Sequence, residues 1–243
     1  MLTPLISIVI PARNEEDNIC NTVSDLEIVL KDLPHETLII NDHSDDTTGA
    51  KISELSISHP SVKLIHNTTT PGFASTLQVG FKAASGNAVV VVMADASDDP
   101  HTILNMAAQF TRGYDLVCGS RYIAGGGKQG GPKTQRFFSF WVNKFFCTIL
   151  RFPTADASNA FKLYRRETLQ NITINETGFA VSLELTIKFW EKNCRIIDVP
   201  TIWKGRVTGK SKFKLCRAFR SYSYLVGIAV AQKFKSIVFK NKK

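Results

Sequence analysis

Residues 89–100, VVVVMADASDDP, are an apolar run that ends in three carboxylates. Four consecutive valines are typical of a strand buried on both faces, as in a parallel sheet. Asp95, Asp98 and Asp99 would then lie at the carboxyl end of that strand, where open α/β sheets bind their ligands. Carboxylate oxygens there can hold a divalent cation, which in turn can hold a diphosphate. A helix cap before Pro100 would use the same carboxylates, so this stretch alone leaves both interpretations open.

Strand-like and helix-like segments alternate through the first half of the chain. Apolar runs predict strands at 4–11, 36–40, 62–66, 89–92 and 116–119, and apolar residues at helical spacing predict helices at 18–31, 47–55, 74–84 and 103–110. This alternation predicts an α/β fold with a mostly parallel sheet flanked by helices.

Polar residues follow the first strands where each of them ends. Asn14 and Glu15 follow the first, Asp42 and Ser44 the second, and the aspartates of residues 95–99 the fourth. Each group alone is typical of a helix cap. In a parallel sheet, however, the groups meet at one edge, where a nucleotide could place its base and ribose at the first two and its diphosphate at the third.

Composition limits the class of protein and the kind of partner. The 243 residues allow one large domain or two small ones. Five scattered cysteines and the absence of a signal-peptide pattern at the start indicate reduced thiols in a cytosolic protein. The net charge of +9 is uneven, because residues 199–243 hold 12 basic and no acidic residues, whereas 18 basic and 21 acidic residues precede them. Such a tail favours an anionic partner: a membrane surface, a phosphorylated ligand or nucleic acid.

Six motifs, in order, resemble those of the family 2 glycosyltransferases with the GT-A fold. In the first half these are residues 11–15 (PARNE), 41–46 (NDHSDD), 93–100 (MADASDDP) and 119–122 (GSRY). Residues 156–165 (DASNAFKLYR) and 206–213 (RVTGKSKF) resemble later motifs of the dolichol-phosphate mannose synthase branch, which glycosylates polyprenyl phosphates.

The resemblance implies how the chain is divided. We expect a GT-A glycosyltransferase domain over residues 1–214, with a nucleotide-sugar-binding half at 1–122 and an acceptor-binding half at 123–214. Residues 215–243 would form a basic amphipathic tail, and C-terminal amphipathic helices would associate with a membrane.

The same resemblance implies the site residues. Asp95 and Asp156 are the expected catalytic residues, and Asp95 and Ser97 the expected ligands of Mg²⁺ or Mn²⁺. Asp156 would place the acceptor or act as a base, although a turn residue in DASN is an equally good interpretation. The expected substrate-binding residues are Pro11, Arg13, Asn14, Glu15, Asp42, Ser44, Gly72, Asp98, Arg121, Arg206, Lys210, Ser211 and Lys212. Glu184 is a further candidate site residue in a helix at 181–190, but a glutamate in a helix is usually exposed to solvent and has no role in a site.

Met93 departs from the family's pattern. It stands where the first aspartate of the usual Asp-x-Asp metal motif is expected. A thioether is a poor ligand for Mg²⁺ or Mn²⁺. The metal would then be held by Asp95, the diphosphate and waters, since Mg²⁺ often takes one or two protein carboxylates. The alternatives are a weaker metal requirement or a non-catalytic subunit that binds nucleotide sugars.

Glycine-rich segments in the second half match nucleotide-binding motifs incompletely. Residues 125–131, GGGKQGG, contain GxGxxG, but they follow the fifth expected strand and not the first. Residues 205–211 are one residue short of a Walker A loop. We therefore expect residues 125–131 to form a mobile loop beside the active site.

Aromatic and basic residues near the C-terminus suggest a membrane surface. A helix at 134–150, rich in Phe and Trp, is expected either to lie buried between sheet and tail or to lie in a membrane interface. The uncharged run at 221–232 is 12 residues long, shorter than the span of about 20 that a bilayer needs. Basic residues flank this run, which favours peripheral attachment.

Taken together, the sequence predicts an inverting hexosyltransferase that moves a sugar from a UDP- or GDP-linked donor to a polyprenyl (dolichyl or undecaprenyl) phosphate at the cytoplasmic membrane face. The expected partners are the nucleotide sugar, the lipid and the membrane surface, with a small membrane-anchoring subunit or a second copy as a further one. Nucleic acid is not expected, because the tail's aromatic residues lie in an apolar run and not among its charges. A glycan or protein acceptor is the alternative.

Overall fold

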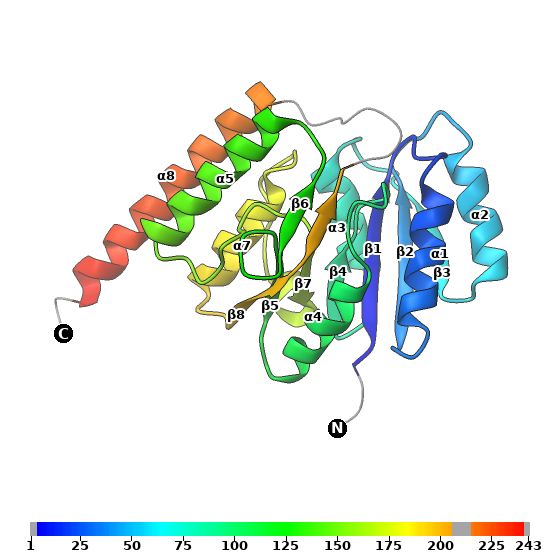
Figure 1. Ribbon diagram of the computed structural model, residues 1–243, viewed down its shortest axis with the longest axis horizontal. Helices are drawn as coiled ribbons and strands as arrows, with labels where there is room; N and C mark the ends of the chain where they lie inside the picture. The colour runs from blue at the N-terminus through cyan, green and yellow to red at the C-terminus, as the bar shows by residue number, and fades with distance from the viewer. Residues whose placement is uncertain (1–3, 206–214, 241–243) are drawn as a thin grey trace.

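A computed structural model of the chain describes residues 4–205 and 215–240, in which a seven-stranded sheet has the order β3-β2-β1-β4-β7-β5-β8 (Figure 1). All neighbouring strands are parallel except β7, which is antiparallel to both β4 and β5. The predicted mostly parallel α/β sheet is confirmed, and β7 and β8 are additions that the apolar pattern did not predict. The strands are β1 Ile6–Ala12, β2 His35–Asn41, β3 Val62–His66, β4 Ala88–Val91, β5 Leu116–Ser120, β7 Lys162–Arg165 and β8 Ile196–Pro200.

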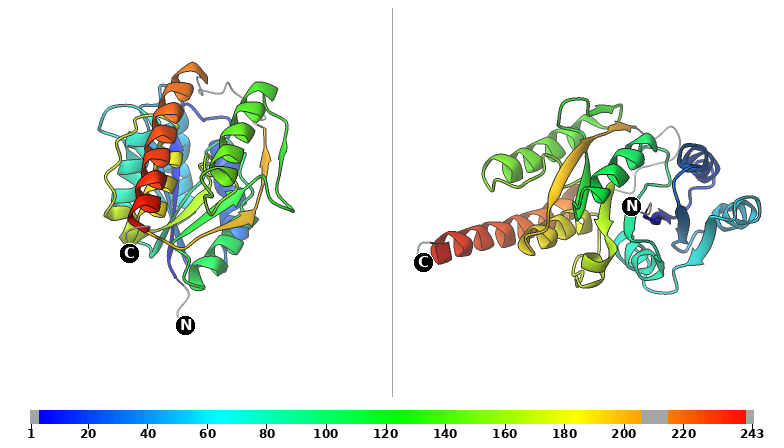
Figure 2. Two further views of the ribbon diagram at one scale, coloured as in Figure 1. Left: turned by 90° about the vertical axis from the view of Figure 1, so that its left-hand side faces the viewer. Right: turned by 90° about the horizontal axis from the view of Figure 1, so that it is seen from below.

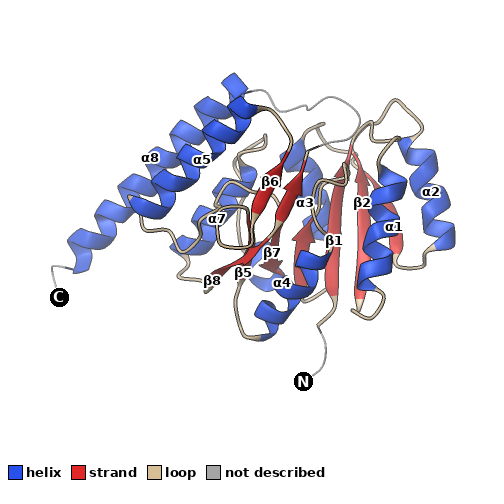
Figure 3. Cartoon of the chain, viewed as in Figure 1, coloured by secondary structure: helices blue, strands red, loops and turns tan. Residues whose placement is uncertain are grey.

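Helices cover both faces of this sheet (Figure 3). One face packs against α1, α2 and α4, and the other against α3, α6 and α7. Each helix packs against its face of the sheet through apolar residues at helical spacing, such as Leu26 and Leu30 of α1. The bounds of these helices are α1 Ile19–Leu30, α2 Thr48–Ser58, α3 Phe73–Ala83, α4 His101–Thr111, α6 Arg166–Gln170 and α7 Val181–Glu191.

Strand β4 lies at the centre of the sheet, between β1 and β7. Val90 points into one apolar cluster and Val89 and Val91 into the other, and all three are buried. Burial of each such side chain stabilises the fold by about 1.5–3 kcal/mol. This double burial explains the unbroken valine run, and it fixes where the chain leaves the sheet on its way to Asp95.

A third apolar cluster joins α5 Lys133–Thr148, α7 and α8 Leu215–Lys240 away from the sheet. Phe146 of α5, Leu183 of α7 and Leu225 of α8 are buried in it. The tail expected at 215–243 is thus a helix that begins packed on the body, while its C-terminal end projects beyond the other helices (Figure 2). Within the described residues, no helix combines the length and apolar character needed to cross a bilayer.

Candidate functional site

Left-handed residues follow three neighbouring parallel strands at their carboxyl ends. Asn14 after β1, His43 after β2 and Ala96 after β4 have φ values of 50°, 53° and 55°. Residues other than glycine rarely adopt this conformation, and alanine gains no local side-chain hydrogen bond in return. Such backbone outliers cluster at ligand sites, where the surrounding structure holds them in place. Three of the five non-glycine residues with positive φ in the described part of the chain therefore lie at the edge that the sequence predicted.

The loops after β1 and β2 are joined by hydrogen bonds between predicted site residues. The Asn14 backbone N–H donates to Ser44 Oγ at 3.0 Å, and Asn14 Oδ1 accepts from the Asp45 N–H at 2.9 Å. The Glu15 carboxylate is buried and accepts a hydrogen bond from the Asn18 side chain at 3.2 Å. Asn14, Glu15 and Ser44 thus lie close together, and their hydrogen bonds hold the loops at the carboxyl edge of the sheet.

Asp42 joins the loop after β2 to the start of α3. Its carboxylate accepts from Asn67 Nδ2 at 2.7 Å and from the Gly72 N–H at 3.1 Å. Arg13 lies 4.0 Å from the same carboxylate. Pro11 lies inside β1, opposite Ile40 of β2. The structure therefore places Arg13, Asp42 and Gly72 in one group, as expected of a shared binding edge.

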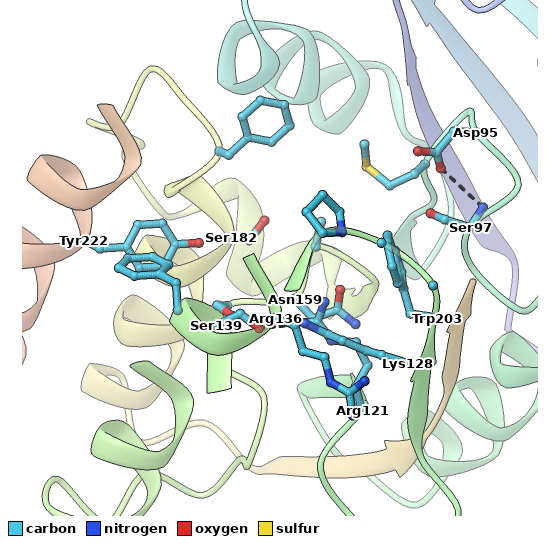
Figure 4. Close-up of a pocket in the computed structure, with 18 residues that line it drawn as sticks. Asp95, Ser97, Arg121, Lys128, Arg136, Ser139, Asn159, Ser182, Trp203 and Tyr222 are labelled. Atoms are coloured by element: carbon cyan, nitrogen blue, oxygen red, sulfur yellow. Dashed lines mark hydrogen bonds between the residues drawn. The ribbon is translucent and has the colours of Figure 1, made fainter. Parts of the chain in front are cut away.

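Asp95 and Ser97 line an inner cavity of about 200 Å³ (Figure 4). The Ser97 N–H donates to Asp95 Oδ1 at 3.3 Å. Ser97 Oγ is buried and has no hydrogen-bond partner among the described residues. Because a buried hydroxyl normally finds a partner, this oxygen indicates a ligand position. Met93 also lines the cavity, where its sulfur adds a soft atom and no hard ligand.

Asp98 lies behind the cavity and is not one of its lining residues. Its carboxylate is buried and accepts a hydrogen bond from the Met93 N–H at 3.0 Å. Burial, with the nearby Asp95 charge adding to it, raises the pKa of Asp98 to about 7. In this position Asp98 supports the turn that carries Asp95, and its predicted role in substrate binding stays a prediction.

Arg121 and Asp156 form a buried ion pair at the opposite end of the cavity. Arg121 Nε lies 2.6 Å from Asp156 Oδ2 and Arg121 Nη2 lies 2.8 Å from Oδ1. The Arg121 N–H and Asn143 Nδ2 also donate to this carboxylate, each at 3.0 Å. With both oxygens engaged and the side chain fully buried, the geometry favours a placing role for Asp156 over a base role.

Lys128 and Arg136 add two cations to the inner cavity, and the sequence did not identify either as a site residue. Lys128 lies in β6 Gly127–Gln129, which pairs with β9 Ile202–Lys204, so the glycine-rich segment is partly a strand beside the cavity. Among the described residues, no carboxylate lies within 4.0 Å of either cation. Burial, helped by the Arg121 charge, lowers the pKa of Lys128 to about 7.

The other lining residues complete the wall between Asp95 and the cations. Phe138, Ser139, Asn159, Phe179, Ser182, Trp203 and Tyr222 are among them. Tyr222 comes from α8, so the tail contributes to the cavity. Glu184 instead holds the segment before α7 by accepting from the Asn175 and Glu176 N–H groups at 2.9 Å. The predicted Arg206, Lys210, Ser211 and Lys212 lie outside the described residues.

A model of the family described as glycosyl transferase family 2 matches residues 7–173. The chain belongs to glycosyl transferase family 2. The chain is 32% identical over 212 residues to the dolichol-phosphate mannosyltransferase of Pyrococcus furiosus, covering 86% of the chain and 59% of that protein. It is 28% identical over 212 residues to the polyprenol monophosphomannose synthase of Mycolicibacterium smegmatis, covering 84% of the chain and 79% of that protein. The chain thus spans less than two thirds of the length of the Pyrococcus relative.

Solved structures of other glycosyltransferases share the fold of this one. The glucosyl-3-phosphoglycerate synthase of Mycobacterium tuberculosis, in complex with Mn²⁺, uridine diphosphate and glucosyl-3-phosphoglycerate, has a TM-score of 0.68 at 19% identity over 95% of this chain and 80% of that one. The mannosyl-3-phosphoglycerate synthase of Rubrobacter xylanophilus has a TM-score of 0.69 at 18% identity over 96% and 74%. These similarities establish a GT-A-like α/β fold.

Proposed function

We propose that this glycosyltransferase moves a hexose, with mannose as the first candidate, from a UDP- or GDP-linked donor to a polyprenyl phosphate. The observation that carries the proposal is the inner cavity, which joins Asp95 and Ser97 to Lys128 and Arg136. Its two ends suit the two phosphorylated substrates of such a transfer. The relatives named as mannosyltransferases of dolichyl, polyprenyl and undecaprenyl phosphate support this choice of sugar and acceptor.

The donor end lies in the proposed nucleotide-sugar-binding half, residues 1–122. Asp95 and Ser97 would hold Mg²⁺ or Mn²⁺ together with the donor diphosphate and waters, a ligand set that Mg²⁺ commonly accepts. The buried Ser97 hydroxyl supports this fit, because a metal would provide its missing partner. Within the described residues, no three His, Cys, Asp or Glu side chains form a metal site by themselves. When bound, the metal would neutralise charge on the departing diphosphate.

The acceptor end lies in the proposed half formed by residues 123–214. A polyprenyl phosphate has a second pKa near 6, so at neutral pH it is largely a dianion and needs no strong base. Its phosphate oxygen would bond to the anomeric carbon while the bond to the diphosphate oxygen breaks on the opposite face. The nucleoside diphosphate would leave with the electron pair, giving inversion. Lys128 and Arg136 would hold the nucleophile, and Asp156 would act by holding Arg121 in place.

Attachment to the cytoplasmic face of a membrane is proposed from the outer surface of α5. Phe137 and Trp141 are 67% and 51% exposed there, and Ile149, which follows the last residue of α5, is 64% exposed, whereas Phe146 on the inner side is fully buried. The inner face of α5 is therefore buried, and the membrane interpretation is proposed for its outer face alone. Exposed Phe and Trp side chains suit the membrane interface, where aromatic rings anchor well. A small membrane-anchoring subunit or a second copy would strengthen this peripheral attachment.

A donor and acceptor screen tests the proposed function. The full chain is incubated with UDP- and GDP-sugars, Mn²⁺ and vesicles containing polyprenyl phosphate, and the products are analysed by mass spectrometry. We expect a glycosyl phosphoryl lipid of inverted anomeric configuration from one class of donor. Absence of product with every donor would contradict the proposal. Nucleotide binding without turnover in calorimetry would indicate a non-catalytic subunit, and a product on a glycan or protein acceptor would indicate the other branch.

A further inference from the structure

Helices α7 and α8 form a third part of the inner cavity, to which they contribute uncharged side chains. Ser182 of α7 and Tyr222 of α8 line the cavity there. In Figure 4 these two side chains lie apart from Asp95 and from Arg121, and the Tyr222 hydroxyl points towards Ser182. The charged lining residues all belong to other segments of the chain, namely Asp95, Arg121, Lys128 and Arg136. This part of the cavity therefore suits a neutral polar group.

Both residues are buried, yet neither hydroxyl has a hydrogen-bond partner among the residues that the structure describes. Tyr222 is 6% exposed and Ser182 is 2% exposed. One turn further along α7, the Thr186 hydroxyl does donate to the Ser182 carbonyl at 2.8 Å, as hydroxyls inside helices commonly do. A buried hydroxyl that faces a cavity without a protein partner is normally bound by a water or a ligand. Two such groups in one part of a cavity indicate a polar ligand.

Packing against α5 and α7 holds Tyr222 in this position. Its ring lies edge-on to Phe138 of α5, with 5.6 Å between the ring centroids, and belongs to the third apolar cluster. Leu225 and Ala229 continue the same face of α8 and are buried in that cluster. Burial raises the pKa of Tyr222 to about 12, so the hydroxyl keeps its proton at neutral pH and can both donate and accept. The cavity therefore has a fixed, neutral hydrogen-bonding group on this side.

We propose that Tyr222 and Ser182 bind hydroxyl groups of the hexose in the nucleotide sugar, and that they contribute to the choice of the sugar that is transferred. This inference rests on the proposed function and adds the residues that contact the sugar. With the diphosphate held at Asp95 and Ser97, the hexose joined to it extends into the same cavity. Ser182 and Tyr222 both lie outside residues 7–173, the part of the chain that the family model matches.

The surroundings of the two hydroxyls favour a sugar over a prenyl chain. Phe138, Phe179 and Trp203 line the same cavity as Ser182 and Tyr222. A hexose has hydroxyls at its edge and C–H groups on its faces, so it can use hydroxyl partners and aromatic surfaces together. A prenyl chain would cover the two hydroxyls without giving them a partner, which costs free energy for each polar group. The hexose is therefore the part of the two substrates that fits here.

Calorimetry of donor binding tests this assignment without acceptor or turnover. The full chain with Mn²⁺ is titrated with UDP-glucose, UDP-galactose and GDP-mannose and, separately, with UDP and GDP. For wild type we expect one nucleotide hexose to bind more tightly than its nucleoside diphosphate. Tyr222→Phe and Ser182→Ala should each weaken that nucleotide hexose by about three- to tenfold, the effect of one lost hydrogen bond between neutral groups. The affinity for the nucleoside diphosphate should stay within about twofold of wild type.

The matched control is Tyr224→Phe, which removes the same hydroxyl from another tyrosine of α8 that is 66% exposed. It should bind both ligands like wild type. Tyr222→Phe should also keep the wild-type free energy of unfolding in urea, because the hydroxyl that it removes has no partner among the described residues. Lower stability together with equal losses for the nucleotide hexose and the nucleoside diphosphate would show a purely structural role and overturn the proposal.

Donors that lack one sugar hydroxyl identify the group that Tyr222 binds. For that hydroxyl, wild type should lose about three- to tenfold in affinity, whereas Tyr222→Phe should lose nothing further because the partner is already absent. If Tyr222→Phe shows the full wild-type loss with every such donor, Tyr222 binds no sugar hydroxyl and the proposal is wrong.

Two further results would also overturn the proposal. The first is a wild type that binds every nucleotide hexose no more tightly than its nucleoside diphosphate. The second is a Tyr222→Phe variant with unchanged donor binding but altered affinity for farnesyl phosphate, which would assign this part of the cavity to the lipid. Because no donor titration contains an acceptor, a donor screen without lipid product leaves these readouts intact, so failure of the proposed function is distinguishable from failure of this inference.

Discussion

Asp156 carries two sequence-based hypotheses, a placing role and a base role, which a substitution separates. Asp156→Asn would leave the buried Arg121 guanidinium without its counter-ion, and removing one partner of a buried pair costs about 3–5 kcal/mol. We therefore expect a comparable loss in the free energy of unfolding by urea, with reduced turnover as a consequence. Loss of kcat with unchanged stability would instead support the base role.

The matched control for this prediction is the double variant Arg121→Gln/Asp156→Asn. Replacing both members of the pair removes the uncompensated charge, so part of the lost stability should return. Turnover should not return, because the Arg121 cation that lines the inner cavity is then absent. Recovery of activity without the Arg121 cation would contradict its assignment to the acceptor end.

Asp95 and Asp99 are close in sequence but differ in surroundings, which gives a second residue-level prediction. Asp95 lines the inner cavity, whereas Asp99 is partly exposed and its Oδ1 lies 3.2 Å from Nδ1 of His101. Asp95→Asn should lower kcat by about a hundredfold or more with a normal melting temperature, since it removes the carboxylate expected to hold the metal. Asp99→Asn should stay within about twofold of wild type. Full activity of Asp95→Asn over an Mn²⁺ titration would refute the metal assignment.

Helix α3 depends on a glycine for its close contact with the inner strand β1. A Cβ at Gly80 would lie 2.3 Å from Val9 Cγ1, so neither element can stay in place when a methyl group is added. Gly80→Ala should lower the free energy of unfolding by about 1–3 kcal/mol, the usual effect of overpacking. The control is Gly227→Ala in α8, where a Cβ meets nothing within 4 Å and alanine improves helix propensity. Equal stability of the two variants in urea would contradict this packing.

Helix α5 supplies the prediction for membrane attachment. Trp141→Glu puts a charge on its exposed face and should reduce flotation with vesicles that contain anionic lipid. Ile57→Glu changes an even more exposed apolar residue, 86% exposed on α2, which lies at the opposite end of the molecule in Figure 1. It should float like wild type. Equal flotation of both variants would exclude α5 as the attachment surface.

At the scale of the whole molecule, the ion pair between Glu27 of α1 and His35 of β2 sets part of the pH dependence of the free energy of unfolding. Burial of Glu27 opposes its ionisation, but hydrogen bonds from His35, Ser61 and Thr37 outweigh this and lower its pKa to about 2. The hydrogen bond to Glu27 raises the pKa of His35, against the opposing effect of burial. Each group thus favours the charged form in the folded state.

The two pKa shifts limit stability at opposite ends of the pH range. The Glu27 contribution is present above its unfolded pKa of about 4.5 and is lost as the pH falls towards 2. The His35 contribution is complete below the unfolded pKa of about 6.5 and is lost as the pH rises through the raised folded value. The difference in unfolding free energy between wild type and Glu27→Gln should therefore peak at about pH 5–6.5, near 1–2 kcal/mol. A difference that is constant from pH 3 to about pH 9 would contradict this coupling.

Local pattern was enough to predict most of the sheet and much of the donor end. The strands β1 to β5 and the helices between them follow from apolar runs and helical spacing. Each of these elements buries apolar residues that lie within one short segment, so the pattern can be recognised locally. The short strands β7 and β8 were missed, since their pairing with β4 and β5 joins residues more than 70 positions apart. Lys128 was missed for a similar reason, because it acts through contacts with Tyr122 and Ser139 that the glycine-rich spacing does not reveal.

The sequence by itself determined the order of elements from β1 to β5, the edge where Asp95 and Ser97 lie, and membership of the glycosyltransferase family. These depend on periodicity and on short motifs, which are local. The tertiary structure decided how two of the carboxylates are engaged, because burial and pairing depend on how the segments fold together: Asp98 accepts a hydrogen bond from the Met93 N–H, and Asp156 is paired with Arg121. Within the part of the chain that the structure describes, it also left Lys128 of the inner cavity with no carboxylate within 4.0 Å, which suits the acceptor end that we propose.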